Sequence, residues 1–310
     1  MSDGTVVAER PGPTADPVVL RRGPIHFFRD PWRKPRILEG ITWAYLAWSI
    51  VPVVIAIVFS FNRGRSRSSW QGFSFRWWTK DPNSLWQDDA LRAALTQSLK
   101  LAVLTMLVAV PLGVAFAIGL DRWRGRVAAT ANFAMLLSFV VPEIILGVSL
   151  LLVFTYTFKS LVDLGTSAQL LGLITFQVSY PVIVVRARLL SIGKEYEEAA
   201  MDLGATPTGA VRRILLPLLY PAIFASCALV FADTLDDFIT VRYLSGPSTS
   251  EPLAVKIFAA ARSSPTPAVN AAAAALLAGT LVAALLGLFL YRAFTKGQRS
   301  ESAVADFAQL

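Results

Sequence analysis

The chain has 310 residues, of which 55% are hydrophobic and only 16% are charged, and its mean hydropathy is +0.54. In soluble domains about a quarter of all residues are charged. This composition therefore excludes an ordinary soluble protein and indicates one that crosses a membrane several times. The net charge of +8 arises mainly from basic residues that flank apolar runs, so nothing here calls for nucleic-acid binding.

The N-terminal segment, residues 1–38, lacks the short apolar core of a cleavable signal. We predict a cytoplasmic leader, partly disordered, whose Pro, Trp, Phe and basic residues suit the inner membrane interface. A membrane domain is predicted over residues 39–296, and a cytoplasmic tail over residues 297–310.

Four charge-free runs are each about as long as the ~20 residues that a helix needs to cross the hydrocarbon, namely residues 40–62, 101–120, 164–185 and 263–291. Two further apolar runs contain carboxylates: residues 127–158 include Glu143, and residues 214–232 end at an Asp cluster. Counting both predicts an all-α polytopic membrane protein with six transmembrane helices. The predicted spans are 41–61, 93–120, 128–157, 166–191, 215–242 and 269–293.

The distribution of Lys and Arg predicts the orientation, because basic loops stay in the cytoplasm. Most flanking Lys and Arg lie beside the two termini and in the second and fourth loops, so both termini are predicted to be cytoplasmic. The first loop, residues 62–92, is the exception, with Arg63, Arg65 and Arg67 on the outer side. Its tryptophans suit an interfacial or docking surface: Trp70, Trp77, Trp78 and Trp86.

Catalytic and cofactor motifs are missing from the sequence. No stretch has Gly, four residues, then Gly-Lys-Ser/Thr, so the chain has no P-loop for ATP. His26 is the single histidine, and Cys227, the single cysteine, lies in a predicted span. We therefore predict that the chain is not an enzyme and holds neither a cofactor nor a metal.

Residues 194–217, which we call the elbow, form a polar insert between the fourth and fifth predicted spans. A short helix is predicted to begin with three acidic residues that suit the positive end of its dipole, Glu195, Glu197 and Glu198. Gly204 can end that helix, and Thr206-Pro207 suits the start of another. The elbow is therefore predicted to display a helix, a tight turn and a second helix in the cytoplasm.

The elbow resembles the EAA motif of the permease subunits of ABC importers, through Glu198-Ala199-Ala200, Gly204, Ile214 and Leu216-Pro217. In that family the short helix is a coupling helix, seated in a groove of the ATP-hydrolysing subunit. The resemblance implies the type I importer permease fold and coupling through residues 195–208. The contact residues it implies are Glu198, Ala199, Ala200, Gly204 and Ala205. An ordinary basic loop is the plainer alternative.

Residues 41–295 are also similar to the second membrane permease of spermidine/putrescine importers. The similarity lies in residues 51–62 and 70–78, VVPEIILGVSLLLVF (140–154), and residues 234–258 and 264–271. It implies a bacterial inner membrane location and a polyamine cargo. The implied partners are a second EAA-type permease, an extracytoplasmic solute-binding protein, membrane lipid and a dimer of ATP-binding subunits that holds ATP and Mg. The long leader, the arginines at 63–67 and Glu143 depart from the family pattern.

Four carboxylates are candidates for the cargo path. Asp233, Asp236 and Asp237 follow one another at i, i+3 and i+4, which predicts one face of the fifth span. Because an ionised Asp in a bilayer costs about 3 kcal/mol on insertion scales, such a group needs water, a partner or a cation. Glu143, directly after Pro142, is predicted to face the bundle interior.

Aromatic side chains beside these carboxylates would suit ammonium groups through cation–π contact, and the candidates are Tyr243, Tyr156 and Trp43. A structural alternative stays open, in which the aspartates pair with arginines or with the partner permease and fix helix packing. The arginines considered are Arg186, Arg188 and Arg242.

Three rival functions remain. The first is an ABC importer for another solute, such as thiamine, iron, sulfate or phosphonate, although sulfate-type cargo would want basic groups in the passage. The second is a proton-coupled secondary transporter or channel, which leaves the elbow unexplained. The third is a membrane enzyme, for which the sequence offers no catalytic constellation.

Overall fold

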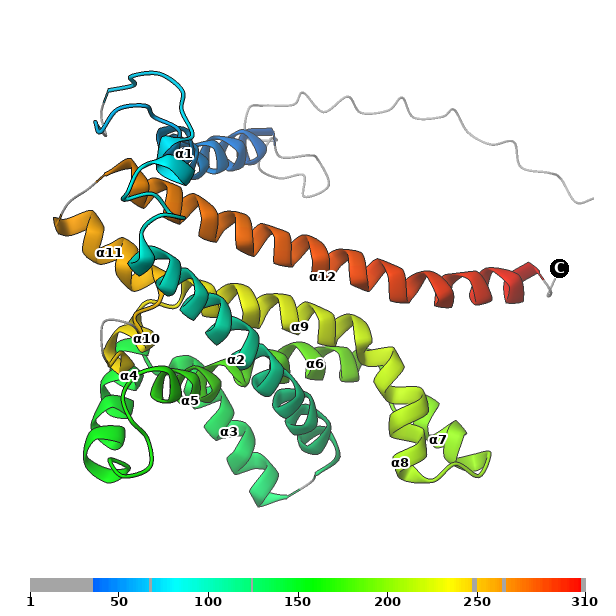
Figure 1. The fold of residues 1–310 in the computed structure, drawn as a ribbon. Helices are drawn as coiled ribbons and strands as arrows, with labels where there is room; N and C mark the ends of the chain where they lie inside the picture. Colours follow the sequence, from blue (N-terminus) through cyan, green and yellow to red (C-terminus); the bar gives the residue numbers. More distant parts are fainter. Residues whose placement is uncertain (1–35, 67–68, 124, 247–249, 264–265, 308–310) are drawn as a thin grey trace, which may run out of the picture. The chain divides into compact units, whose positions relative to one another are not determined.

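The computed structural model describes residues 36–66, 69–123, 125–246, 250–263 and 266–307. Within these ranges the chain is almost wholly helical, and its one isolated bridge joins Asn62 to Phe73 (Figure 1). Residues 1–51 and 52–310 form two units, which are described separately. Most of the predicted leader lies outside the described residues, and residues 297–307 continue the last helix.

The α-helices follow in the order α1 (Arg36–Ser60), α2 (Asp89–Arg122), α3 (Arg126–Val140), α4 (Glu143–Leu152), α5 (Thr166–Gln177), α6 (Ser179–Ile192), α7 (Glu195–Asp202), α8 (Pro207–Ala210), α9 (Leu216–Asp236), α10 (Ile239–Leu244), α11 (Leu253–Ser263) and α12 (Pro267–Phe307). Three short π-helical segments accompany them: η2 (Arg76–Lys80), η3 (Val153–Thr157) and η4 (Val211–Leu215).

Among the described residues, five helical segments are long and apolar enough to cross a membrane, and a shorter apolar one spans Glu143–Thr157. The long segments are Leu38–Ser60, Asp89–Arg122, Thr166–Ile192, Pro207–Asp236 and Pro267–Phe289. They confirm the predicted first, second, fourth and sixth spans. The segment Glu143–Thr157 lies within the predicted third span and is shorter than the five others.

The third and fifth predicted spans were wrong as single helices. Residues 128–157 break at Val141 and Pro142, both of which are extended, with ψ of 125° and 133°. Proline disfavours helical conformation in the residue before it, so α3 ends there and Glu143 begins α4. The predicted span 215–242 breaks in the same way at Asp237, whose ψ is 118°.

The core of the second unit is built around α9, which packs against α2, α6 and α12. Buried Val114 of α2, Val185 of α6 and Leu219 of α9 belong to one cluster of apolar side chains. Gly113 allows α2 to approach α6 closely, because a Cβ there would lie 2.4 Å from Cγ of Pro181. Burial of these surfaces against one another fixes the relative positions of the three helices.

The loop between α1 and α2, which we predicted to be the outer loop and call the outer cap below, is folded rather than an open surface. The buried Asn62 side chain donates to the carbonyls of Ser66 and Ser69 and accepts from the backbone N–H of Gln71. The Trp77 indole donates to the Asn62 carbonyl at 2.8 Å, and its ring is 0% exposed against the start of α12. The prediction that all four tryptophans form a docking surface is therefore wrong for Trp77.

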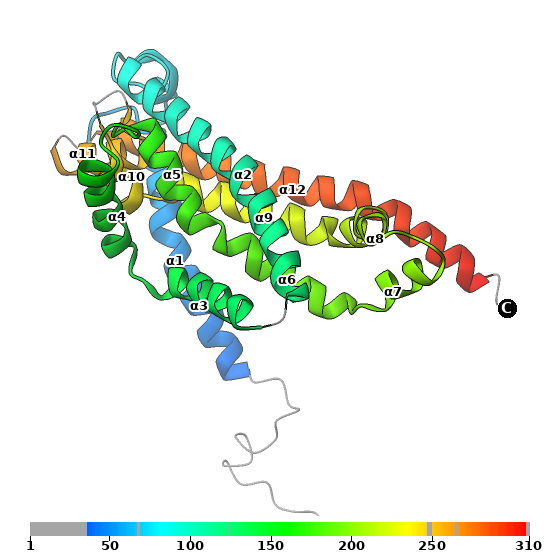
Figure 2. The same cartoon turned by 90° about the horizontal axis from the view of Figure 1, so that it is seen from below.

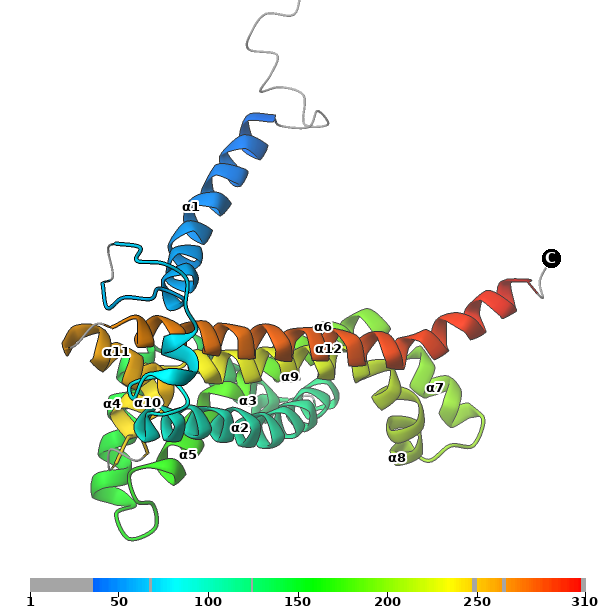
Figure 3. The same ribbon diagram turned by 45° about the horizontal axis from the view of Figure 1, so that its top comes forward.

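The second unit has two different ends. The α7 and α8 helices lie together at one end, and α4, α10 and α11 lie at the other (Figures 1, 2 and 3). The long helices α2, α9 and α12 run between them (Figure 3). The elbow and the aspartates at the end of α9, Asp233 and Asp236, are therefore at opposite ends of the same helix bundle.

Candidate functional site: the elbow and the acidic end of the bundle

The elbow has the predicted form of a helix, a tight turn and a second helix. Gly204 ends the first helix, α7, with φ of 90°, a conformation that favours glycine. The N–H of Ala205 donates to the Ala200 carbonyl at 3.0 Å, which closes a Schellman-type helix end. Thr206 then caps α8, since its hydroxyl accepts from the Gly209 N–H at 3.2 Å and Pro207 occupies the first helical position.

The candidate coupling residues lie on the surface of the elbow. The α7 helix has no buried residue, and Glu198, Ala199, Gly204 and Ala205 are exposed, with Ala200 partly buried. Exposed apolar side chains surround them: Tyr196, Met201 and Leu203. The elbow is anchored further along the chain, where Ala210 and Leu215 are almost fully buried. A rigid base thus presents a free surface that mixes small, acidic and apolar groups.

At the opposite end, Asp237 stands in the break between α9 and α10. Its carboxylate accepts from the N–H groups of Thr240 and Val241, at 3.0 and 3.3 Å, and so caps the first turn of α10. The prediction that Asp237 shares a helix face with Asp233 and Asp236 is wrong, because Asp237 has left the helix. The carboxylate is held in place by backbone donors rather than by a cation.

Asp233 is held from the neighbouring helices α5 and α6. It accepts from Nε2 of Gln177 at 2.7 Å and lies 3.5 Å from the hydroxyl of Tyr180. Among the described residues, no Lys or Arg forms an ion pair with Asp233, Asp236 or Asp237.

The arginines considered as partners in the structural alternative bind elsewhere, so that alternative does not hold for them within this chain. Arg186 donates to Asn132, Arg188 to the Leu218 carbonyl, and Arg242 to Glu251.

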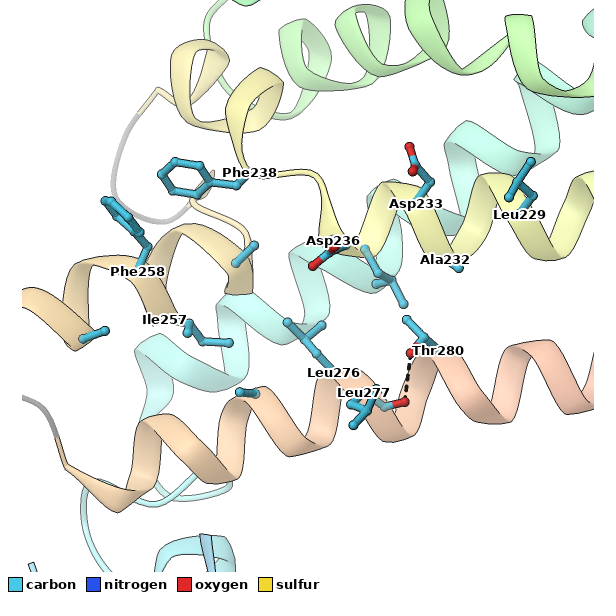
Figure 4. Close-up of a pocket in the computed structure, with 14 residues that line it drawn as sticks. Leu229, Ala232, Asp233, Asp236, Phe238, Ile257, Phe258, Leu276, Leu277 and Thr280 are labelled. Atoms are coloured by element: carbon cyan, nitrogen blue, oxygen red, sulfur yellow. Dashed lines mark hydrogen bonds between the residues drawn. The ribbon is translucent and has the colours of Figure 1, made fainter. Parts of the chain in front are cut away.

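Asp236 differs from Asp233 and Asp237 in its surroundings. It is exposed and, with Asp233, borders a cavity of about 760 Å³ between α9, α11 and α12 (Figure 4). The rest of the lining is mainly apolar, with the rings of Phe238 and Phe258 in contact at 4.5 Å between ring centres and tilted by 45° to each other. The carboxylates of Asp233 and Asp236 point in different directions in this view (Figure 4).

Glu143 and Tyr243 come from α4 and α10, which pack together. Glu143 is partly buried at the start of α4 and interacts electrostatically with Asp237 and with Tyr180. Tyr243 packs on Gly147 of α4, where a Cβ would lie 3.1 Å from its ring. Glu143, Asp233 and Asp237, which we call the acidic cluster, all lie within electrostatic range of Tyr180, and Asp233 lies 3.5 Å from its hydroxyl.

The aromatic neighbours of the acidic cluster differ from those predicted. Tyr180 packs edge-to-face on Phe139 at 5.1 Å and on Phe176 at 5.7 Å. Tyr156 is in η3 and Trp43 in α1, and both are exposed. Sequence reasoning missed Gln177 and Tyr180, although two polar residues inside a charge-free span offered a clue. Oε1 of Gln177 is buried with no partner among the described residues, next to Asp233.

The comparisons with known proteins identify the class. The model of the family described as "Binding-protein-dependent transport system inner membrane component" matches residues 109–300. The chain belongs to this family. It is an importer permease, a multi-pass membrane subunit of a transport system and not itself an ATPase, and the EAA resemblance of the elbow is confirmed at the level of the family.

Curated relatives are similar over most of the chain. The putrescine transport system permease PotI of Escherichia coli K12 is 33% identical over 84% of this chain and 91% of its own length. The spermidine/putrescine transport system permease PotC of the same strain is 33% identical over 86% of this chain and 98% of its own. PotC of Haemophilus influenzae is 32% identical over 81% and 94%.

Solved structures show the same fold. A chain of a bacterial ABC transporter involved in the import of the acidic polysaccharide alginate matches with a TM-score of 0.67 at 17% identity, over 84% of this chain and 96% of that chain. The MetNI methionine transporter matches with a TM-score of 0.55 at 17% identity, over 66% and 94%. The predicted type I importer permease fold is thereby confirmed.

Proposed function

We propose that this chain is the permease subunit of an ATP-driven importer of polyamines. A second EAA-type permease completes the passage, and an extracytoplasmic binding protein delivers putrescine or spermidine to it. A pair of ATP-binding subunits, which hold ATP and Mg, engages the elbow. In this arrangement the elbow and both termini are cytoplasmic, and the acidic end of the bundle faces outward.

The observation that carries the cargo assignment is the acidic cluster, which has no cationic partner among the described residues. Glu143 begins α4, Asp233 is near the end of α9, and Asp237 is in the break after α9. All three interact electrostatically with Tyr180. Like charges that interact in an environment of low polarity repel one another, and a cation with several N–H donors relieves that repulsion. A primary ammonium group provides three such donors.

The surroundings suit the rest of a polyamine. The phenol of Tyr180 and the free Oε1 of Gln177 offer further oxygen atoms, and the rings of Phe139 and Phe176 offer cation–π faces. The names of PotI and PotC, which concern putrescine and spermidine, agree with this chemistry.

Coupling to ATP rests on the elbow. Glu198 and Gly204 are both exposed on the elbow, so Glu198 is free to pair with a partner's basic group and Gly204 permits close backbone approach. The exposed Leu203 and Met201 add apolar area that a partner's groove would cover. The rival proton-coupled transporter gives this surface no role.

The test is uptake of labelled putrescine and spermidine by proteoliposomes that contain the complete importer. Glu143→Gln and Asp237→Asn should each lower the rate by more than roughly tenfold, because each removes one charge that the ammonium group meets. The ATP-binding subunit should still co-purify with both variants. Asp89→Asn is the matched control, since that side chain is 88% exposed and its ion pair among the described residues is with Arg92 on the surface.

Normal transport kinetics in both Glu143→Gln and Asp237→Asn would remove the cargo assignment. If the importer instead moved thiamine or an iron complex and ignored polyamines, the rival ABC importer would replace it. Transport by the purified chain alone, without ATP, would favour the secondary transporter.

A further inference from the structure

The α7 helix has few contacts with the rest of the bundle. It contains no buried residue, and its neighbours in space are mainly α8 and η4, which follow it directly in the chain. One long-range ion pair supplements these contacts: Arg122 donates to Glu197. Glu197 is only 17% exposed and Arg122 is 39% exposed, so this pair is better shielded than most surface pairs.

Arg122 is the last residue of α2, which is one continuous helix of 34 residues and therefore about 50 Å long. The helix packs along α6 and α9, and its contact at Gly113 with Pro181 has no free space. Pro111 removes one backbone hydrogen bond near the middle of α2, but buried Val110 and Val114 on either side of it pack in the same apolar cluster as residues of α6 and α9. This packing braces α2 across the proline, so displacement of its last turn can reach its first turns.

The other end of α2 makes hydrogen bonds near the acidic end of the bundle. Nε2 of Gln97 donates to Oε1 of Gln169 at 2.9 Å, and Gln169 in turn donates to the Val241 carbonyl of α10. The hydroxyl of Ser98 accepts from the N–H of Leu253, at the start of α11, at 2.8 Å. These three polar side chains are buried, so the bonds have no competition from water.

We propose that the Arg122–Glu197 ion pair is the link that transmits movement of the elbow to α2, and through Gln97 to α10 beside the acidic cluster. Arg122 and Glu197 are positioning residues, since neither meets cargo or nucleotide. The inference rests on the proposed function, because it supposes that an ATP-binding subunit moves the elbow. The ion pair adds a second connection between the elbow and the acidic end of the bundle, besides the covalent one through η4 and α9.

The experiment measures uptake and ATP hydrolysis in parallel on the complete importer in proteoliposomes. Arg122→Glu and Glu197→Arg should each lower the number of solute molecules moved per ATP by roughly fivefold or more. The exchange variant with both substitutions restores the opposite charges and should return to within about twofold of wild type. Arg122→Gln and Glu197→Gln, which introduce no repulsion, should lower the ratio less than the charge reversals.

Arg126→Glu is the matched control, because it reverses a charge four residues further on, in a residue for which the structure gives no ion pair. This variant should keep the wild-type ratio. The link is refuted if the single reversals keep the ratio, or if the exchange variant is no better than either single one. A wild-type complex without ATP-driven uptake would instead refute the proposed function itself.

Discussion

The elbow and the acidic cluster are the two candidate sites of this chain, and they are built in opposite ways. In the elbow, every hydrogen bond that shapes the turn joins residues at most five positions apart, and the candidate coupling residues are largely exposed. In the acidic cluster, Asp233 is held by Gln177 and Tyr180, more than fifty positions away. Substitutions in the elbow should therefore affect function with little change in folding, whereas those in the acidic cluster should affect both.

The largest effect is expected from Gly204→Trp. Nothing lies within 4 Å of a Cβ at this position, so the indole would project from the elbow into the space that a partner needs. We expect ATP-driven uptake to be lost, with the ATP-binding subunit absent from the purified complex. Gly72→Trp is the control, since Gly72 also has positive φ and free space around it, but lies on the outer loop. Retention of the ATP-binding subunit by Gly204→Trp would contradict this role.

A second glycine sharpens the contrast between surface and packing. Gly113→Ala should lower the free energy of unfolding by about 1–3 kcal/mol, because its Cβ would overlap the Pro181 ring and lie 3.0 Å from the Val178 carbonyl. Gly119→Ala, on the same helix with free space, should be neutral or slightly stabilising. Thermal unfolding in one detergent measures both, and equal midpoints for the two variants would contradict the close approach of α2 and α6.

The two functions of Asp237, as a charge and as a helix cap, can be separated. Asp237→Asn keeps an oxygen for the Thr240 and Val241 N–H groups, whereas Asp237→Ala removes it. We expect the Ala variant to be less stable than the Asn variant by about 1 kcal/mol, the usual value of a cap. Both should be deficient in uptake to a similar extent. Equal stability of the two would show that the cap contributes nothing.

Much of the elbow could be predicted from sequence because glycine, Thr-Pro and clustered acids act through neighbouring residues. The crossings were also predictable, since length and apolarity decide them. The breaks at Pro142 and Asp237 were harder, because an apolar run shows where the chain is buried and not where its helix is interrupted. Gln177 and Tyr180 were missed because their roles arise only when α5 and α6 pack against α9.

The smallest expected effect concerns a carboxylate that does have a cation. Asp81 is buried in the outer cap, and burial raises its pKa. Hydrogen bonds from Asn83 and Arg76 and the charge of Arg76 outweigh this, so the pKa lies below its usual range. A lowered pKa contributes stability above about pH 4, which is lost as the pH falls further. The outer cap should therefore loosen below pH 4 in the wild type.

Tryptophan fluorescence during acid titration measures this loosening, because Trp77 and Trp78 pack inside the cap. Arg76→Gln removes the counter-charge and should shift the midpoint upward. Arg76→Gln should not affect the acidic cluster, which has no such cation among the described residues. An unchanged midpoint would mean that the Arg76–Asp81 pair adds nothing to the stability of the cap.

The most direct test of the account is photo-crosslinking from the elbow in native membranes. A photoreactive amino acid at Leu203, which is 90% exposed, should form an adduct with the ATP-binding subunit. The same amino acid at Leu161, which is 78% exposed in the loop after η3, should form none with that subunit. The contradicting result would be efficient photoactivation at position 203 with no adduct to an ATP-binding subunit, in a complex that still imports solute. The elbow would then not be the binding site of the ATP-binding subunit.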